Sequence, residues 1–174
     1  GPVNRVTEKI NELYGHDIID SLAKAYVDVH YHDLKRRVRI ALGDEALNDN
    51  ASTMYERDGN TNGAVEEAVD WCVDDINMPE VIEAFAYEQK WSLGESIRTY
   101  IEEQLQIGGD GELKTMFLRT VIEEVDWGDL AELYIPDAGV EDAIRDILRE
   151  LVEEKMEELD DLEYAELSRE EDEE

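Results

Sequence analysis

Three histidines and one cysteine are among the side chains of this sequence whose chemistry could serve catalysis. Residues 16–17 and 32–33 are histidine–aspartate pairs, and imidazole with carboxylate suits a divalent cation. Such pairs recur by chance in a chain with 19 Asp residues, and His30 and His32 would share a face only in a strand. Cys72 falls on an apolar helical stripe, which is typical of a core position. The sequence also lacks a phosphate-binding glycine loop, a nucleophile elbow and an HExxH pattern. We therefore predict no catalytic residue and no enzyme.

Residues 58–69 contain the sharpest local pattern of oxygen-bearing side chains. Loop positions 1, 3, 5 and 9 are Asp58, Asn60, Asn62 and Glu66, with glycine at position 6 and an apolar residue at position 8. This spacing resembles the calcium loop of EF-hand proteins, although position 12 is Val69 where that family has a bidentate Glu. One interpretation is a calcium site formed by those four side chains. The other is an Asn/Gly-rich turn in which Asn62 caps the next helix. Apart from calcium, we predict no cofactor.

The elements that must position these residues have mostly helical spacing. We expect helices over 4–14 and 17–42, a polar connection over 44–63, and a helix with Val65, Val69, Cys72 and Ile76 in phase. Further helices are expected from Pro79 with Asn77 as its cap, from a capping box at Ser92, over 113–125 and 130–134, and from Asp137 as the last cap. The predicted fold class is all-α, an irregular bundle of about seven helices with an acidic C-terminal helix and tail. Alternating residues near 26–42 leave a small β-hairpin as the alternative.

Length and composition predict one helical domain over 1–167 and an acidic tail over 168–174. Gly1-Pro2 is typical of a protease-cleavage scar. No apolar run approaches the ~20 residues of a membrane span, and we expect no secretory leader. One cysteine excludes a disulfide framework and fits a reducing compartment. We therefore expect a soluble, cytoplasmic protein without a membrane partner.

Charge is the strongest signal in the sequence: 16 Lys+Arg face 47 Asp+Glu, for a net charge of −31. Residues 1–42 are nearly neutral, so the remainder carries the whole excess. Such a charge argues against direct binding to nucleic acid or anionic lipid, because like charges repel. The basic cluster at 35–39 alone would suggest a phosphate contact. In so acidic a chain we instead expect it to neutralise acids of another helix or of a second subunit.

We predict that the acidic surface itself binds a partner. B-DNA carries one negative charge per ~1.7 Å of its axis, so the net 32 negative charges of residues 43–174 match about 54 Å of duplex. The candidate partner-binding residues are Glu102, Glu103, Glu123, Glu124, Asp126, Asp129, Glu150, Glu153, Glu154, Glu157, Glu158, Asp160 and Asp161.

A small, helical, strongly acidic chain ending in 169–174, Arg-Glu-Glu-Asp-Glu-Glu, resembles the phage DNA-mimic anti-restriction proteins (the Ocr-like class). The resemblance is one of size, helicity, charge and acidic tail over the whole chain, and carries over no individual residue. It implies a homodimer that works in the host cytoplasm. It also implies an inhibitor that occupies the basic DNA-binding groove of a host restriction or other defence protein. The nearly neutral first quarter departs from an all-acidic mimic. Two alternatives stay open: an acidic helical adaptor that binds another protein without imitating DNA, and a halophilic cytoplasmic protein.

Overall fold

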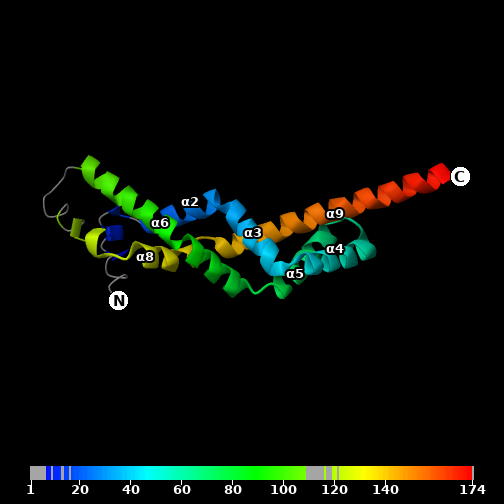
Figure 1. Ribbon diagram of the computed structural model, residues 1–174, viewed down its shortest axis with the longest axis horizontal. Coiled ribbons are helices and arrows are strands. Elements are labelled where there is room, and N and C mark those ends of the chain that lie inside the picture. The colour runs from blue at the N-terminus through cyan, green and yellow to red at the C-terminus, as the bar shows by residue number, and fades with distance from the viewer. Residues whose placement is uncertain are drawn as a thin grey trace. The chain divides into compact units, whose positions relative to one another are not determined.

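The computed structural model describes residues 7–8, 10–12, 14–15, 17–108, 116, 119–120 and 122–173 (Figure 1). In these residues the regular structure is helical, without a strand: seven α-helices and one 3₁₀ turn have defined bounds, and further helical residues lie within 7–14 and 116–124. The predicted all-α class is confirmed. The chain divides into two compact units: unit 1 comprises Gly1–Tyr31 and Ile82–Val140, and unit 2 comprises His32–Val81 and Glu141–Glu174. The single domain expected over 1–167 stays a prediction, which an unfolding experiment can test.

Unit 1 contains α2 (Ile18–Val29), most of α6 (Met78–Gly108), α8 (Trp127–Tyr134) and the 3₁₀ turn η1 (Ile135–Asp137). Helix α2 packs against α8 and η1. The Asp17 side chain caps α2 by accepting a 3.0 Å hydrogen bond from the Asp20 backbone N–H. Buried between α2 and α6, the Tyr26 hydroxyl donates to the Gln89 side-chain oxygen at 2.7 Å.

Two glycines allow α6 and α8 to approach closely in unit 1. A Cβ on Gly94 would lie 2.6 Å from the Trp127 carbonyl oxygen, and a Cβ on Gly128 would lie 2.6 Å from the Trp91 ring. The buried Trp127 ring is fixed by its Nε1–H, which donates to the Ile122 carbonyl at 3.1 Å. The helix start predicted at Ser92 is wrong, since α6 continues through it. A glycine is needed at position 94 because α8 packs closely against it, and not because a helix begins there.

Unit 2 is built from α3 (Tyr31–Leu42, from its second residue), α4 (Asp44–Asp58), α5 (Asn62–Asp75) and α9 (Val140–Glu173, from its second residue). Helices α4 and α5 lie side by side, and α9 passes along them (Figure 1). The polar connection predicted over 44–63 is wrong, because most of it is α4. The buried face of α4 includes Asn50 beside Ala51 and Met54, so its apolar stripe is interrupted. Asn50 donates to the Asp75 carboxylate at 2.8 Å.

The segment 17–42 is two helices, and neither the single long helix nor the β-hairpin expected there is formed. The two helices are separated at His30, whose backbone N–H still donates to the Tyr26 carbonyl at 3.0 Å. The His30 ring stacks on Tyr26, with ring centroids 3.8 Å apart and planes at 17°. This ring contact lies where the first helix ends. The spacing of apolar residues in the sequence does not indicate it.

The beginning and end of α9 also differ from the sequence prediction. Asp137 lies in η1, so it does not cap α9, which begins at Val140 after Gly139 with φ +77°. The helix continues to Glu173, so the described part of the tail expected over 168–174 is helical. In contrast, the predicted cap Asn77 is confirmed, because its side-chain oxygen accepts from the Glu80 N–H at 3.2 Å.

Candidate functional site

Helix α9 positions the densest group of predicted partner-binding acids. Its buried side chains recur at helical spacing, which anchors one face of the helix and turns the acids outward. These buried residues are Ile144, Ile147, Leu148, Leu151, Val152 and Met156. After Met156, no described side chain of α9 is buried. The helix has 34 residues, or about 51 Å at ~1.5 Å per residue.

The structure places seven of the thirteen predicted acids on α9 in unit 2. Glu150 is half-buried, and the other six, Glu153, Glu154, Glu157, Glu158, Asp160 and Asp161, are exposed. From Glu141 to Glu173 this helix carries 16 acids against four bases. The acids therefore lie about one per 3 Å of helix, using the rise of ~1.5 Å per residue.

The other six predicted acids lie in unit 1: two are on α6, and the other four lie before α8 or in its first turn. Glu103, Glu123, Glu124, Asp126 and Asp129 are exposed and Glu102 is half-buried. Glu102 pairs with Arg98 at 3.0 Å, and the Asp126 carboxylate caps α8 through the Asp129 N–H, also at 3.0 Å. At least one of these acids therefore has a structural role in its own helix.

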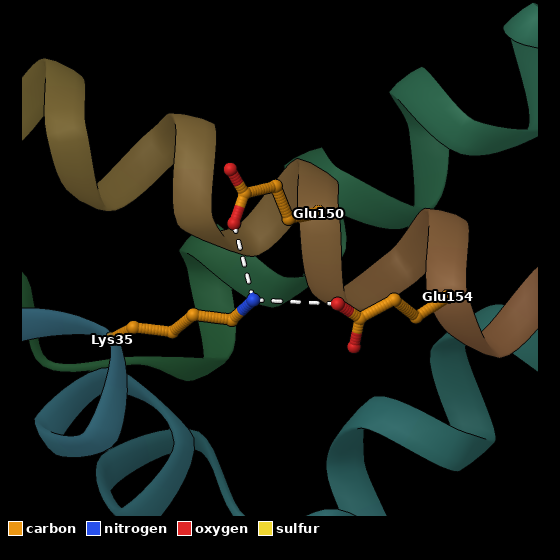
Figure 2. Close-up of polar contacts among 3 residues, drawn as sticks. All are labelled: Lys35, Glu150 and Glu154. Carbon is orange, nitrogen blue, oxygen red and sulfur yellow. Dashed lines mark hydrogen bonds and ion pairs between the residues drawn. The ribbon is translucent and has the colours of Figure 1, made fainter. Parts of the chain in front are cut away.

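Lys35 of α3 joins two of the α9 acids within unit 2 (Figure 2). Its Nζ lies 3.2 Å from a Glu150 oxygen and 3.3 Å from a Glu154 oxygen, and its side chain is 22% exposed. Desolvation opposes the charged ammonium, but the hydrogen bonds to both carboxylates outweigh it and raise the pKa of Lys35. The prediction that the basic cluster neutralises acids of another helix is confirmed for Lys35. Figure 2 shows both carboxylates turned toward this one nitrogen.

Further along α9, residues from α4 and the following turn hold Asp160 in place. Its two oxygens accept from the Asn60 amide and from the Tyr55 hydroxyl, each at 2.7 Å. These bonds, that of Asn60 first, lower the pKa of Asp160. The Tyr55 hydroxyl also contacts Glu163, and this contact with that to Asp160 raises the pKa of Tyr55. Glu163 was not among the predicted residues, although its position three residues after Asp160 places it on the same face.

The four side chains of the EF-hand-like loop have separate surroundings. Asn60 donates to Asp160, and Glu66 pairs with Arg149, whose hydrogen bond lowers the pKa of Glu66. Asp58 ends α4 and Asn62 begins α5, both exposed. Within the described part of the chain, no group of three or more His, Cys, Asp or Glu side chains is placed to hold a metal ion. Calcium binding by this loop stays a prediction.

The cap of α5 differs from the one expected in the turn interpretation. The Thr61 hydroxyl, and not Asn62, accepts from the Ala64 N–H at 3.2 Å. Thr61 has the extended backbone typical of such caps, while Asn62 is already helical.

The cysteine and the histidines were the other residues considered for catalysis. Cys72 is fully buried, which confirms the core position, and burial raises the pKa of its thiol although Asn50 donates to the sulfur. His32 is exposed and His30 stacks on Tyr26. His16 lies outside the described residues. None of the helices described here is both long and apolar enough for a membrane span.

No protein-family model, curated protein or solved structure significantly matches this chain.

Proposed function

We propose that this protein is an acidic DNA mimic that occupies the basic DNA-binding groove of another protein, such as a restriction or other defence enzyme. The observation that supports this proposal is the exposed array of carboxylates on α9. Its acids, one per about 3 Å, have a spacing close to the ~3.4 Å that separates phosphates along one DNA strand. No reaction is assigned to the chain, and the carboxylates act as fixed charges.

Fixed carboxylates suit this role because a flexible acidic chain would lose conformational entropy on binding. Lys35 holds Glu150 and Glu154, and Asn60 with Tyr55 holds Asp160. The partner would release the anions that neutralise its groove, as it does when it binds DNA. Association would be accelerated by charge and would weaken steeply as salt rises.

The test is capture of proteins from a bacterial lysate on the immobilised chain, with two parallel elutions. One elution uses a 30-base-pair duplex at constant ionic strength, and the other uses salt; mass spectrometry identifies the proteins. A mimic should release DNA-binding proteins into the duplex elution, because both ligands need the same groove. Partners that stay bound through the duplex and leave only with salt or detergent would contradict mimicry and favour the adaptor.

Two variants of equal net charge test whether binding depends on the acids of α9 in particular or only on the total charge of the protein. The first changes Glu153, Glu157, Glu158 and Asp161 of α9 to the corresponding amides. The control makes the same change at exposed acids of α4 and α5, namely Asp44, Glu56, Asp70 and Asp74. The α9 variant should lose the captured proteins at a lower salt concentration than the control. Equal losses in the two variants would contradict a specific role for α9.

A further inference from the structure

Two exposed aromatic rings lie one helical turn apart on the unit 1 part of α6. The residues are Tyr87, 64% exposed, and Trp91, 62% exposed. Glu83 precedes Tyr87 by four residues and Glu95 follows Trp91 by four, and both acids are exposed. Since residues four apart are neighbours on a helix, this face presents an acid, two aromatic rings and a second acid in succession.

The protein's own Lys90 already places a cation against these rings. Its Nζ lies 4.4 Å from the centroid of Tyr87 and 5.1 Å from that of Trp91, within the ~6 Å range of cation–π attraction. Glu132 of α8 pairs with the same nitrogen at 3.3 Å, and the Lys90 side chain is only 12% exposed. The charge of Lys90 is thus balanced by Glu132, while each aromatic residue keeps more than half of its surface exposed to solvent.

The position of Trp91 is fixed by the close approach of α6 and α8. Its ring packs where a side chain on residue 128 would otherwise lie, so Gly128 provides the space for it. A ring held in this way loses little conformational freedom when a partner binds.

We propose that Glu83, Tyr87, Trp91 and Glu95 form a docking site for an arginine-bearing segment of a partner protein. A guanidinium group is planar, stacks on aromatic faces and forms paired hydrogen bonds with carboxylates, whereas a lysine ammonium is a compact point charge. The exposed acids attract the cation, and the rings select arginine. This site lies in unit 1, apart in sequence from the α9 carboxylates, and does not depend on DNA mimicry.

The test uses the full chain and two fluorescein-labelled peptides of equal length and charge, one of alternating Arg–Gly and one of alternating Lys–Gly. Fluorescence anisotropy at constant ionic strength gives the two affinities. We expect the arginine peptide to bind about fivefold more tightly, in line with exposed cation–π contacts. Equal affinities would overturn the proposal, because general charge attraction does not distinguish the peptides.

The double variant Tyr87→Ala/Trp91→Ala should abolish the preference for arginine. The control Trp71→Ala removes a 36% exposed tryptophan of unit 2 and should preserve the preference. A preference that survives in the double variant would also overturn the site.

A second pair of variants keeps both rings, since loss of Trp91 also removes its contact with Gly128. Glu83→Gln/Glu95→Gln should weaken the arginine peptide about threefold, with an unchanged melting temperature. The control Glu45→Gln/Glu56→Gln changes the same charge at exposed positions of α4 and should have a smaller effect. Equal weakening in both would show that the acids next to the rings have no special role and would overturn the proposal.

Discussion

Units 1 and 2 are similar in length but differ in charge and in what joins their helices. Unit 1 has 18 acids and 7 bases in 90 residues, a net charge of −11, whereas unit 2 has 29 acids and 9 bases in 84 residues, a net charge of −20. In unit 1, α6 and α8 meet through glycine and tryptophan. In unit 2, polar side chains join α9 to α3, α4 and α5. Unit 1 also has the Lys90–Glu132 ion pair between α6 and α8, and α9 of unit 2 also buries an apolar face. The difference is therefore one of degree, with more of the named contacts in the more acidic unit responding to pH and salt.

The largest expected effect is that of Gly94→Ala in unit 1. The new methyl group would lie 2.6 Å from the Trp127 carbonyl oxygen, and backbone cannot move aside as a side chain can. We expect a loss of about 2–3 kcal/mol in the free energy of unfolding, measured by urea titration. The control is Gly63→Ala in α5, where a Cβ meets nothing within 4 Å, and it should be neutral or slightly stabilising.

The same variant shows whether the two units unfold separately. In a Trp71→Phe background the remaining tryptophans, Trp91 and Trp127, both belong to unit 1, while thiol labelling of buried Cys72 reports unit 2. If only the fluorescence midpoint shifts in Gly94→Ala, the units are independent. Equal shifts of both probes would instead support the single domain predicted from the sequence.

The next effect concerns the polar core of unit 2, where Asn50→Ala removes the hydrogen bond to Asp75. We expect a loss of about 1–1.5 kcal/mol and faster labelling of Cys72 by a thiol reagent in mild urea. Asn48→Ala, at a half-buried position of the same helix, is the control and should cost less than ~0.5 kcal/mol. Equal labelling rates in the two variants would contradict a special role for Asn50.

A smaller effect is expected from Lys35→Met, which removes the ion pairs to Glu150 and Glu154 while keeping the aliphatic chain. Both carboxylates are about half exposed, so we expect a loss of about 1 kcal/mol, reduced in high salt. The control Arg145→Met, which removes a 3.6 Å ion pair to Glu141 of the same helix, should cost less. An equal loss of unfolding free energy in the two variants would mean that the ion pairs from Lys35 to α9 add no stability.

The smallest effects are in the pH dependence of unit 2. The pKa values of Glu66 and Asp160 are lowered by their partners, so each contributes stability that is present at neutral pH and lost as pH falls below its ordinary value, 4.5 or 3.8. Lys35 and Tyr55 have raised pKa values, so their contributions are present at neutral pH and lost above about pH 10. Melting temperature should therefore fall as the pH drops below 4.5. In Asp160→Asn this acid-side fall should be shallower, and an unchanged profile would contradict the assignment.

The sequence predicted what depends on local spacing. The stripe of Val65, Val69 and Cys72 indicated α5, and Asn77 was recognised as a cap, because both patterns depend on residues within a few positions. Helix α4 was missed because buried Asn50 interrupts its stripe. The continuity of α6 was missed because Gly94 is required by Trp127, a residue 33 positions away.

The candidate site was predictable to a similar extent. The apolar stripe of α9 places its acids outside, so their exposure could be inferred from spacing. The stripe was also expected to continue through Leu162 and fade after Leu167, but burial ends at Met156 and both leucines are exposed. The hydrogen bond from Asn60 to Asp160 joins residues 100 positions apart, and the pattern of neither segment indicates it. The same holds for Lys35, for which the sequence predicted acidic partners but not which ones.

The long sequence separation of Lys35 from Glu150 has a consequence during protein synthesis. These residues are 115 positions apart, so a ribosome adding ~5–20 residues per second completes Glu150 roughly 6–23 s after Lys35. Unit 1 ends at Val140 and unit 2 requires the segment made after it. On the growing chain, unit 1 can therefore form first. At that stage Lys35 of α3 still lacks Glu150 and Glu154, which are synthesised later. A ribosome-stalled chain that ends at Val140 should accordingly be cleaved by trypsin within 35–39 faster than the full-length protein.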